Sequence, residues 1–325
     1  MFSLDHYRAL QDGAGLFERE HRGRIVLRGD DRKAYLHGLL SNDILGLETG
    51  GWCYATLLTA QGRMISDMRV FDLGHLILLD LERTVAPLVH AHLDKFVIAE
   101  DVVVENVTDA LAQLGLYGPK APGVLAAATA DDPSSAPLFI LPSSDIGIPG
   151  VDLVGPRETA AALAAALERA GAVRVDADAA ELTRIEAGIP KFLVDMDSTT
   201  IPLEAGIEDR AISMTKGCYV GQEVIVRVLH RGGGRVARRL VGMVVDGAAP
   251  RAGDLVLSGE REIGRVTSAA DSPRIGKTIA LASVHRDYVE PGTELTVSSP
   301  PDALRAVVVE LPFGAGRPGV DGRAY

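Results

Sequence analysis

Short apolar runs and longer amphipathic segments follow one another through the first half of the chain. The short runs are rich in Val, Ile, Leu and Tyr and are bounded by Gly, which predicts β-strands. Apolar residues at helical spacing predict an α-helix at Val85–Phe96. Because neighbouring strands follow one another in mixed order, the pattern favours an α+β fold over a strictly parallel, doubly wound sheet. The strands expected in this half are Arg24–Arg28, Cys53–Leu58, Met68–Leu73, Leu76–Asp80 and Asp101–Val107.

Two further helices are expected in the middle of the chain. Arg157–Ala170 is rich in alanine, carries leucines at helical spacing and precedes Gly171, a residue type that commonly follows the last turn of a helix. A second helix is expected to start near Asp178, with Glu181 as its capping-box partner, and to end at Gly188.

From about Arg238 the pattern changes to short β runs at regular spacing. They are separated by Gly, Pro and Asp, which is typical of a small β-barrel or sandwich. The expected strands are Leu240–Val245, Leu255–Leu257, Ile263–Thr267, Thr278–Ala282, Glu294–Val297 and Arg305–Glu310.

These patterns divide the chain into regions. Residues 1–235 form the α+β region, which a loop near 129–150 splits into two subdomains. The clearest part of that loop is the polar stretch 130–137 (ADDPSSAP). Residues 236–313 form the β domain. The Gly-rich end, 314–325, is expected to be disordered.

Composition places the chain among ordinary water-soluble proteins. Hydrophobic residues make up 47% and charged residues 24% of the 325 positions. No run approaches the ~18 apolar residues of a membrane helix, and the start (MFSLDHYRALQDG) lacks the apolar region of a signal peptide. The net charge of −11 disfavours stable nucleic-acid binding. The two cysteines, Cys53 and Cys218, exclude a disulfide framework, lie in no CxxC pair and indicate a reducing, cytoplasmic compartment.

Basic residues nevertheless cluster between positions 227 and 239, around the glycines 232–234. Two interpretations have equal weight. The cluster could receive an anionic ligand, such as a folate with its polyglutamate tail, or it could be the solvated face of a strand and turn. The residues concerned are Arg227, His230, Arg231, Arg235, Arg238 and Arg239.

The segment 216–223, KGCYVGQE, has neither a helix nor a strand period. Gly217 and Gly221 allow a tight bend or a close approach to a ligand. Lys216 stands two residues from Cys218, and a nearby ammonium favours a thiolate. The residues alone favour a glycine-punctuated turn with a buried cysteine, since free Cys is often buried.

The same segment resembles the signature of the YgfZ-type folate-binding proteins. These are related to a mitochondrial iron–sulfur assembly factor and belong to one superfamily with the T-protein of the glycine cleavage system, an aminomethyltransferase. Other segments resemble the family in the same order, and the resemblance spans roughly residues 20–313. They are RIVLRGDDRKAYLHGLLSND, LLTAQGRMISDMRVF, TRIEAGIP, RRLVGMVVDG and GRVTSAADSP. The resemblance implies an α+β core with ferredoxin-like elements around a central cavity, followed by a β-barrel.

The resemblance also implies roles for residues in two of these segments. Glu186, in TRIEAGIP, matches the glutamate that binds the pterin in the T-protein family, with Arg184 close by; a helix-surface glutamate is the alternative. Asp67 matches the aspartate that lies beside the folate nitrogen in aminomethyltransferases; a turn-capping aspartate is the alternative with equal weight. Phe71 stands where the family often has a folate-contacting tyrosine, and its ring could still stack on the ligand.

Within the signature, Tyr219 and Gln222 are candidate contacts for folate or a partner protein, and Lys216 and Arg227 are candidate cations for the folate glutamate. Cys218 is a candidate redox-sensitive thiol or transient iron ligand. A single thiolate does not hold a stable iron–sulfur cluster, which needs about four ligands, and no metal site is expected.

Two functions follow from these residues. The first is a tetrahydrofolate-binding accessory protein of the YgfZ type, which acts with iron–sulfur assembly or client proteins; the intact KGCYVGQE segment supports it. The alternative is an enzyme, a tetrahydrofolate-dependent aminomethyl or one-carbon transferase; Asp67 supports it. Other enzyme classes find little support, because the chain has no GxxxxGK[ST] and no GxSxG motif and its histidines are scattered.

Overall fold

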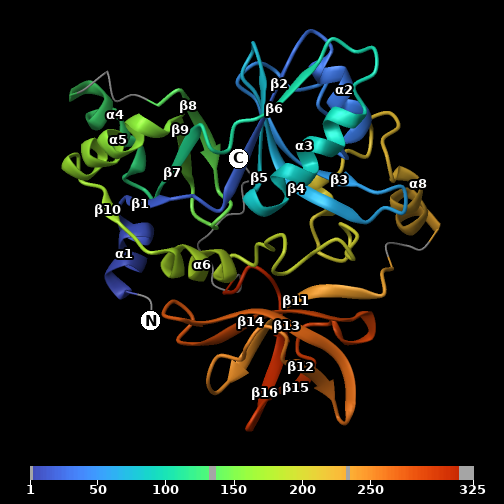
Figure 1. Cartoon of the computed structure of the whole chain (residues 1–325). Helices are drawn as coiled ribbons and strands as arrows, with labels where there is room; N and C mark the ends of the chain where they lie inside the picture. The colour runs from blue at the N-terminus through green and yellow to red at the C-terminus, as the bar shows by residue number, and fades with distance from the viewer. Residues whose placement is uncertain (1–2, 132–136, 232–234, 315–325) are drawn as a thin grey trace.

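The structure, a computed structural model, describes residues 3–131, 137–231 and 235–314. Within these residues the chain forms two five-stranded sheets and a closed six-stranded barrel. Figure 1 shows the two sheets on one side of the molecule and the barrel on the other, with α6 (Ala177–Glu186) running between them. The expected α+β class with a C-terminal β-barrel is therefore confirmed. The expected disordered end lies outside the described residues, except for Gly314.

The first sheet is antiparallel, and its two faces differ in chemistry. On β4, Met68 and Val70 belong to the hydrophobic core that the sheet shares with helices α2 (Arg32–Leu39) and α3 (Ala86–Lys95). Asp67 takes an alternate position and therefore faces the other side. The strands, in sheet order, are β3 (Trp52–Leu58), β4 (Met64–Asp72), β5 (Ile77–Glu82), β2 (Arg22–Arg28) and β6 (Val103–Asn106).

The second sheet is antiparallel except where β1 pairs with β10. Alanines and leucines of α4 (Ala121–Asp131) and α5 (Arg157–Arg169) pack against it in one core. The helix expected over 157–170 is thus confirmed, and Gly171 follows it with φ of +106°, a conformation that favours glycine. In sheet order the strands are β10 (Val173–Arg174), β1 (Gly15–Glu18), β7 (Leu111–Tyr117), β9 (Gly150–Pro156) and β8 (Phe139–Ser143).

Helix α6 begins at Ala177 and is capped differently from the expectation. Asp176 is the N-cap, and its carboxylate accepts a 2.8 Å hydrogen bond from the amide of Ala179. The expected capping box is therefore wrong. Glu181 lies in the second turn, where it pairs with Arg184 instead. Helix α1 (Leu4–Asp12) packs beside α6 in a shared apolar cluster.

The barrel contains all six expected strands. Most of them are longer than the apolar runs that predicted them, because barrel strands continue into exposed polar positions at their ends. Its interior is filled by Val, Ile, Leu, Ala and one methionine, Met243. The strands, in order around the barrel, are β11 (Arg238–Asp246), β14 (Lys277–His285), β13 (Arg261–Ser272), β12 (Leu255–Ser258), β15 (Glu294–Ser299) and β16 (Asp302–Val309).

The segment between α6 and the barrel returns to the first sheet. Its apolar residues, among them Phe192 and Ile225, pack on Leu58 and Met64 of the β3–β4 hairpin. No helix in the described part of the chain is long and apolar enough to cross a membrane. The short helical elements are η1 (Arg83–Val85), α7 (Glu208–Ala211), α8 (Gln222–Val226), the π-helix η3 (Arg227–Arg231) and η4 (Arg286–Tyr288).

Candidate functional site

A cavity of about 710 Å³ lies between the two sheets, α6 and the chain that follows α6. This volume is in the range of small-molecule sites, roughly 300–1,000 Å³. Aromatic rings form part of the wall, namely Phe17, Trp52, Tyr54 and Phe192. Many of the remaining wall residues are charged, among them Arg19, Arg22, Asp67, Arg69, Glu82, Asp145, Glu181, Arg184, Lys191 and Arg210.

The register of β3 and β4 sets the wall on the first sheet. Trp52 pairs with Phe71, and Tyr54 pairs with Arg69. Asp67 precedes Arg69 by two positions on the same face, so the Tyr54 side chain reaches it diagonally. Phe71 itself does not line the cavity. It is 1% exposed and stacks on Trp52 with 5.8 Å between ring centroids, so Trp52 takes the place expected for Phe71.

Asp67 has one bound and one unpartnered oxygen. Its Oδ2 accepts a 2.6 Å hydrogen bond from the Tyr54 hydroxyl. Its Oδ1 is buried and has no hydrogen-bond partner among the described residues. Burial raises the pKa of Asp67 above its ordinary value, against the opposing effects of Arg22, the Tyr54 hydrogen bond and Arg210. Because buried polar atoms are rarely left unpaired, Asp67 is the wall group best suited to accept a hydrogen bond from a ligand.

A buried network of ion pairs joins the two sheets behind this wall. Arg19 pairs with Asp152 of β9 at 2.9 Å. Arg69 of β4 contacts both Asp152 and Asp80, and Arg22 pairs with Asp80 at 2.9 Å. Removing one partner of such a buried pair typically costs about 3–5 kcal/mol. The network therefore holds the two sheets at a fixed spacing and keeps the cavity preformed.

Helix α6 supplies Glu181 and Arg184 to the opposite wall. The Glu181 side chain is 36% exposed and pairs with Arg184 at 2.6 Å. The Arg184 guanidinium also pairs with Asp195 at 2.7 Å and donates to the Ser268 hydroxyl of the barrel at 2.9 Å. Arg184 thus lines the cavity, but its main contacts anchor α6, the following loop and the barrel to one another. Glu181 and the exposed Asp178 are the carboxylates of α6 that line the cavity.

Glu186 lies on another side of α6. Five residues of helix separate it from Glu181, which turns it about 140° around the axis. It is 2% exposed, accepts hydrogen bonds from the hydroxyls of Tyr7 (2.9 Å) and Ser272, and does not line the cavity. The expected contact between Glu186 and a pterin therefore does not fit this cavity. Its position makes Glu186 a link between α1, α6 and the barrel.

The KGCYVGQE segment packs beside the first sheet, and none of its residues is among those that line the cavity. The Lys216 ammonium donates to the carbonyls of Leu40 (2.6 Å) and Asn42 (2.9 Å), after the end of α2. It also lies 5.1 Å from the centroid of the buried Tyr219 ring. Burial lowers the pKa of Lys216 to about 8. Lys216 and Tyr219 therefore anchor the segment to the fold.

The local geometry of the segment explains why a glycine stands at position 221. Gly221 has φ of +85°, and a Cβ there would lie 2.5 Å from the carbonyl oxygen of Thr59. Gln222 follows as the first residue of α8, and Arg227 is exposed. The glycine-punctuated turn is thus present, but the buried cysteine is wrong, because Cys218 is exposed.

The basic cluster is only partly described. Arg239 pairs with Glu208 at 2.8 Å, and Arg235 and Arg238 are exposed. The side chains of His230 and Arg231, and the glycines 232–234, lie outside the described residues. The two interpretations of this cluster keep their equal weight.

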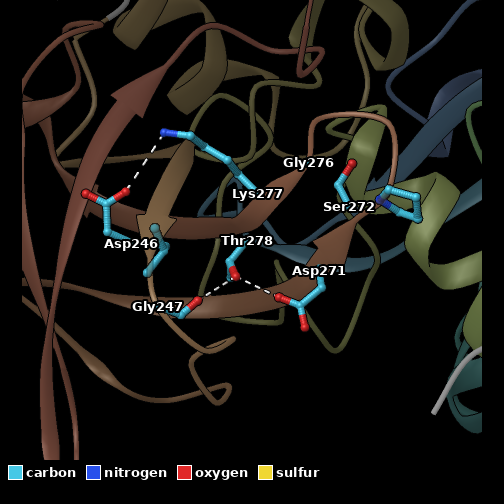
Figure 2. A pocket seen from close by; sticks show the side chains of 9 residues that line it. Asp246, Gly247, Asp271, Ser272, Gly276, Lys277 and Thr278 are labelled. Atoms are coloured by element: carbon cyan, nitrogen blue, oxygen red, sulfur yellow. Dashed lines mark hydrogen bonds and ion pairs between the residues drawn. The ribbon is translucent and has the colours of Figure 1, made fainter.

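A second hollow, of about 560 Å³, lies on the barrel (Figure 2). Its polar groups contact one another. The Thr278 hydroxyl lies within hydrogen-bond distance of the Asp271 carboxylate (2.6 Å) and the Gly247 carbonyl (2.7 Å), and Lys277 lies 3.9 Å from Asp246. With its charges already paired, this hollow is a weaker candidate than the cavity between the sheets.

Several cavity residues were not expected from the sequence. Tyr54 lies on the predicted strand Cys53–Leu58, and Trp52 extends that strand by one residue. Only the β3–β4 register shows that Asp67 lies on the strand opposite them. Glu181 was given a capping role. Nothing in the sequence indicated that Cys53 lines the cavity, where burial raises its pKa to about 12.

Comparison with known proteins agrees with this architecture. The family model for the GCVT N-terminal domain matches residues 2–216, and the model for the glycine cleavage T-protein C-terminal barrel domain matches residues 238–314. Aminomethyltransferases of Geobacillus sp. (strain WCH70) and Lysinibacillus sphaericus (strain C3-41) are each 29% identical to this chain, over 95% of it and 89% of their own length. The crystal structure of glycine cleavage system aminomethyltransferase T from Bartonella henselae has the same fold, with a TM-score of 0.85, 24% identity, and coverage of 95% of this chain and 89% of its own. The chain belongs to the glycine cleavage T-protein family.

Proposed function

We propose that this protein binds tetrahydrofolate in the cavity between the sheets and uses Asp67 to promote transfer of a one-carbon unit from an aminomethyl donor. The observation that carries the proposal is the buried, unpartnered Oδ1 of Asp67 in the wall of a preformed cavity. The aminomethyltransferase names of the relatives support the same reaction class.

The residues of the cavity fit a reduced folate. A pterin is flat and carries amino and amide donors, which suit aromatic walls and a carboxylate acceptor. Trp52 and Tyr54 supply the aromatic surface, and Glu181 supplies an accessible carboxylate. In this proposal Glu181 replaces Glu186 as the pterin contact, because Glu186 faces away from the cavity.

The mechanism assigns separate tasks to these residues. Tetrahydrofolate, when bound, would supply the two amine nitrogens that take up the one-carbon unit. The two bonds that hold this carbon in the donor break, and the two protons from the folate nitrogens go to the released ammonia and to the remainder of the donor. Asp67 accepts a proton at its free oxygen and passes it to the departing amine. Its raised pKa suits it to exchange a proton, because an acid–base group works best near the operating pH. The hydrogen bond from Tyr54 holds the carboxylate in one orientation.

Calorimetric titration with tetrahydrofolate tests the ligand and its orientation. Glu181→Ala should weaken binding by about tenfold or more, as expected for the loss of one charge-assisted hydrogen bond. Glu186→Ala is the matched control on the same helix. It should bind as the wild type does, although its melting temperature should fall. If the wild type binds no folate, the proposal is wrong. If only Glu186→Ala loses affinity, the assignment of Glu181 is wrong.

A second candidate is the accessory role of the YgfZ type in iron–sulfur protein maturation. The exposed thiol of Cys218, within the KGCYVGQE segment, favours it. Expression of variants in cells that lack the endogenous protein distinguishes the two functions, with the activity of iron–sulfur enzymes as the readout. Loss with Cys218→Ser but not with Asp67→Asn would support the accessory role and exclude the transferase. Loss with Asp67→Asn alone would exclude a role centred on the thiol.

A further inference from the structure

The cavity carries one arginine that stands apart from the others. Arg210, on α7, is exposed and lines the cavity, so it lies at the opening. Its guanidinium carbon is 4.5 Å from the centroid of the Tyr54 ring. Its guanidinium forms no ion pair with any residue in the described ranges, and the neighbouring Glu208 is bound by Arg239 at 2.8 Å.

The other arginines of the cavity all have carboxylate partners. Their charges are used to hold the fold, and Lys191 lies 4.0 Å from Glu181. Among the described residues of the cavity wall, Arg210 is therefore the arginine or lysine without a carboxylate partner. The pairs are Arg19 with Asp145 and Asp152, Arg22 with Asp80 and Glu82, Arg69 with Asp80 and Asp152, and Arg184 with Glu181 and Asp195. In a chain with a net charge of −11, an unpaired guanidinium at a cavity opening is a local attraction for anions.

Arg210 is also held in place. The Asn42 side-chain amide donates to the Arg210 carbonyl at 3.0 Å, and the Ser41 hydroxyl donates to the next carbonyl, that of Ala211, at 2.6 Å. The Tyr54 ring covers one face of the guanidinium and is fixed through its own hydrogen bond to Asp67. A stacked guanidinium keeps its N–H edge free, and that edge matches a carboxylate with two parallel hydrogen bonds.

We propose that Arg210 binds a carboxylate of the ligand at the cavity opening and thereby selects ligands that carry one there. The inference rests on the proposed function for the identity of that ligand. Two sources share this chemistry, namely the glutamate end of a folate and the carboxylate of an amino-acid-derived aminomethyl donor. The contact lies beside Tyr54 and Asp67, so it would also orient the ligand relative to the carboxylate that exchanges the proton.

A folate-independent experiment tests the carboxylate site directly. The chain contains one tryptophan, Trp52, and it lines the cavity, so its fluorescence reports on this site alone. Titration with glutarate, a plain dicarboxylate, should change Trp52 emission in the wild type. Arg210→Met should weaken the response about tenfold, and Arg210→Lys should fall between, since it keeps the charge and loses the planar fork. Arg261→Met, an equal loss of charge at an exposed barrel position, should respond as the wild type does.

The outcome of this titration decides the proposal. An equal response from Arg210→Met and wild type, or no response from either, would overturn it. If the response depends on Arg210 but the wild type binds no folate, the proposed function fails and the carboxylate site stands.

Calorimetry then identifies the source of the carboxylate. The wild type is compared with Arg210→Met for binding of tetrahydrofolate and of tetrahydropteroate, which lacks the glutamate. If the wild type prefers tetrahydrofolate and this preference disappears in Arg210→Met, the site binds the folate carboxylate. N-methylglycine serves as an unreactive stand-in for a carboxylate-bearing donor. If the wild type prefers it over its amide and this preference disappears in the same variant, the site binds the donor carboxylate. If neither preference depends on Arg210, a carboxylate of either ligand does not bind there and the proposal is wrong.

Discussion

Replacing Asp67 by Asn should make the protein more stable at neutral pH while it removes turnover. Burial sets the folded-state pKa of Asp67 above its ordinary value of 3.8. Above that folded-state pKa, the ionised carboxylate costs stability, because the unfolded chain holds the charge more easily. Asparagine resembles the protonated carboxyl in size and stays neutral, so it escapes this cost. Its amide oxygen can still accept the hydrogen bond from Tyr54.

The size and pH dependence of the effect follow from linkage. Each unit by which the pKa is raised is worth about 1.4 kcal/mol at a pH above both pKa values. The difference between Asp67→Asn and wild type should vanish below the ordinary pKa, where both states are protonated. It should grow as the pH rises from there to the folded-state pKa, and stay constant above it. Removal of a general acid–base group should lower turnover by about 100-fold or more.

Melting temperatures of both proteins between acidic and neutral pH measure the stability effect, and formation of methylene-tetrahydrofolate measures turnover. Asp30→Asn, at an exposed position, is the control and should change neither. The reasoning is refuted if Asp67→Asn is less stable than the wild type at neutral pH, or if the difference between them does not depend on pH. A fully active Asp67→Asn would refute the catalytic assignment, whatever its stability.

Three further predictions concern the signature segment and the anchor of α6. Iodoacetamide should modify the exposed Cys218 and react at least about tenfold more slowly with Cys53, because burial raises the pKa of Cys53 to about 12. Mass analysis of the peptides measures the two rates, and equal rates would contradict the burial of Cys53. Gly221→Ala should lower the melting temperature, because position 221 has a φ of +85° and the added Cβ would clash with the β3–β4 turn. Gly217→Ala is the control and should not lower it, because no atom lies within 4 Å of its added Cβ. Equal effects of the two variants would show that backbone conformation and close packing do not require glycine at position 221. Arg184→Met should destabilise the protein by about 3–5 kcal/mol in denaturant unfolding, because it leaves the buried Asp195 carboxylate without its cationic partner. A change below about 1 kcal/mol would show that the anchor is weak.

The parts of the fold that depend on local pattern could be predicted from the sequence. Alternating apolar residues separated by Gly and Asp indicated every strand of the barrel, because strand and turn preferences act over a few residues. The alanine-rich α5 followed for the same reason. The cap of α6 was misassigned, because Asp176 and Asp178 are both acceptable N-cap residues and only the backbone distinguishes them.

The candidate site followed from the sequence only in part. Asp67, which the family resemblance singled out just before a predicted strand, lies in the cavity wall. The choice between Glu181 and Glu186 depended on which side of α6 meets the cavity, and that is determined by how α1 and the barrel pack on the helix. The KGCYVGQE segment stood out by its composition, yet its packing against α2 and the β3–β4 turn removes it from the cavity wall.

The sequence by itself therefore determined the barrel strands, several strands and helices of the α+β region, and the T-protein superfamily. Only the tertiary structure decided which side chains share the cavity. Trp52, Tyr54 and Asp67 come from the β3–β4 hairpin, whereas Glu181 and Arg210 come from helices much later in the chain. The raised pKa of Asp67 depends on its neighbours in the folded protein, because burial and nearby charge act through space and not along the chain.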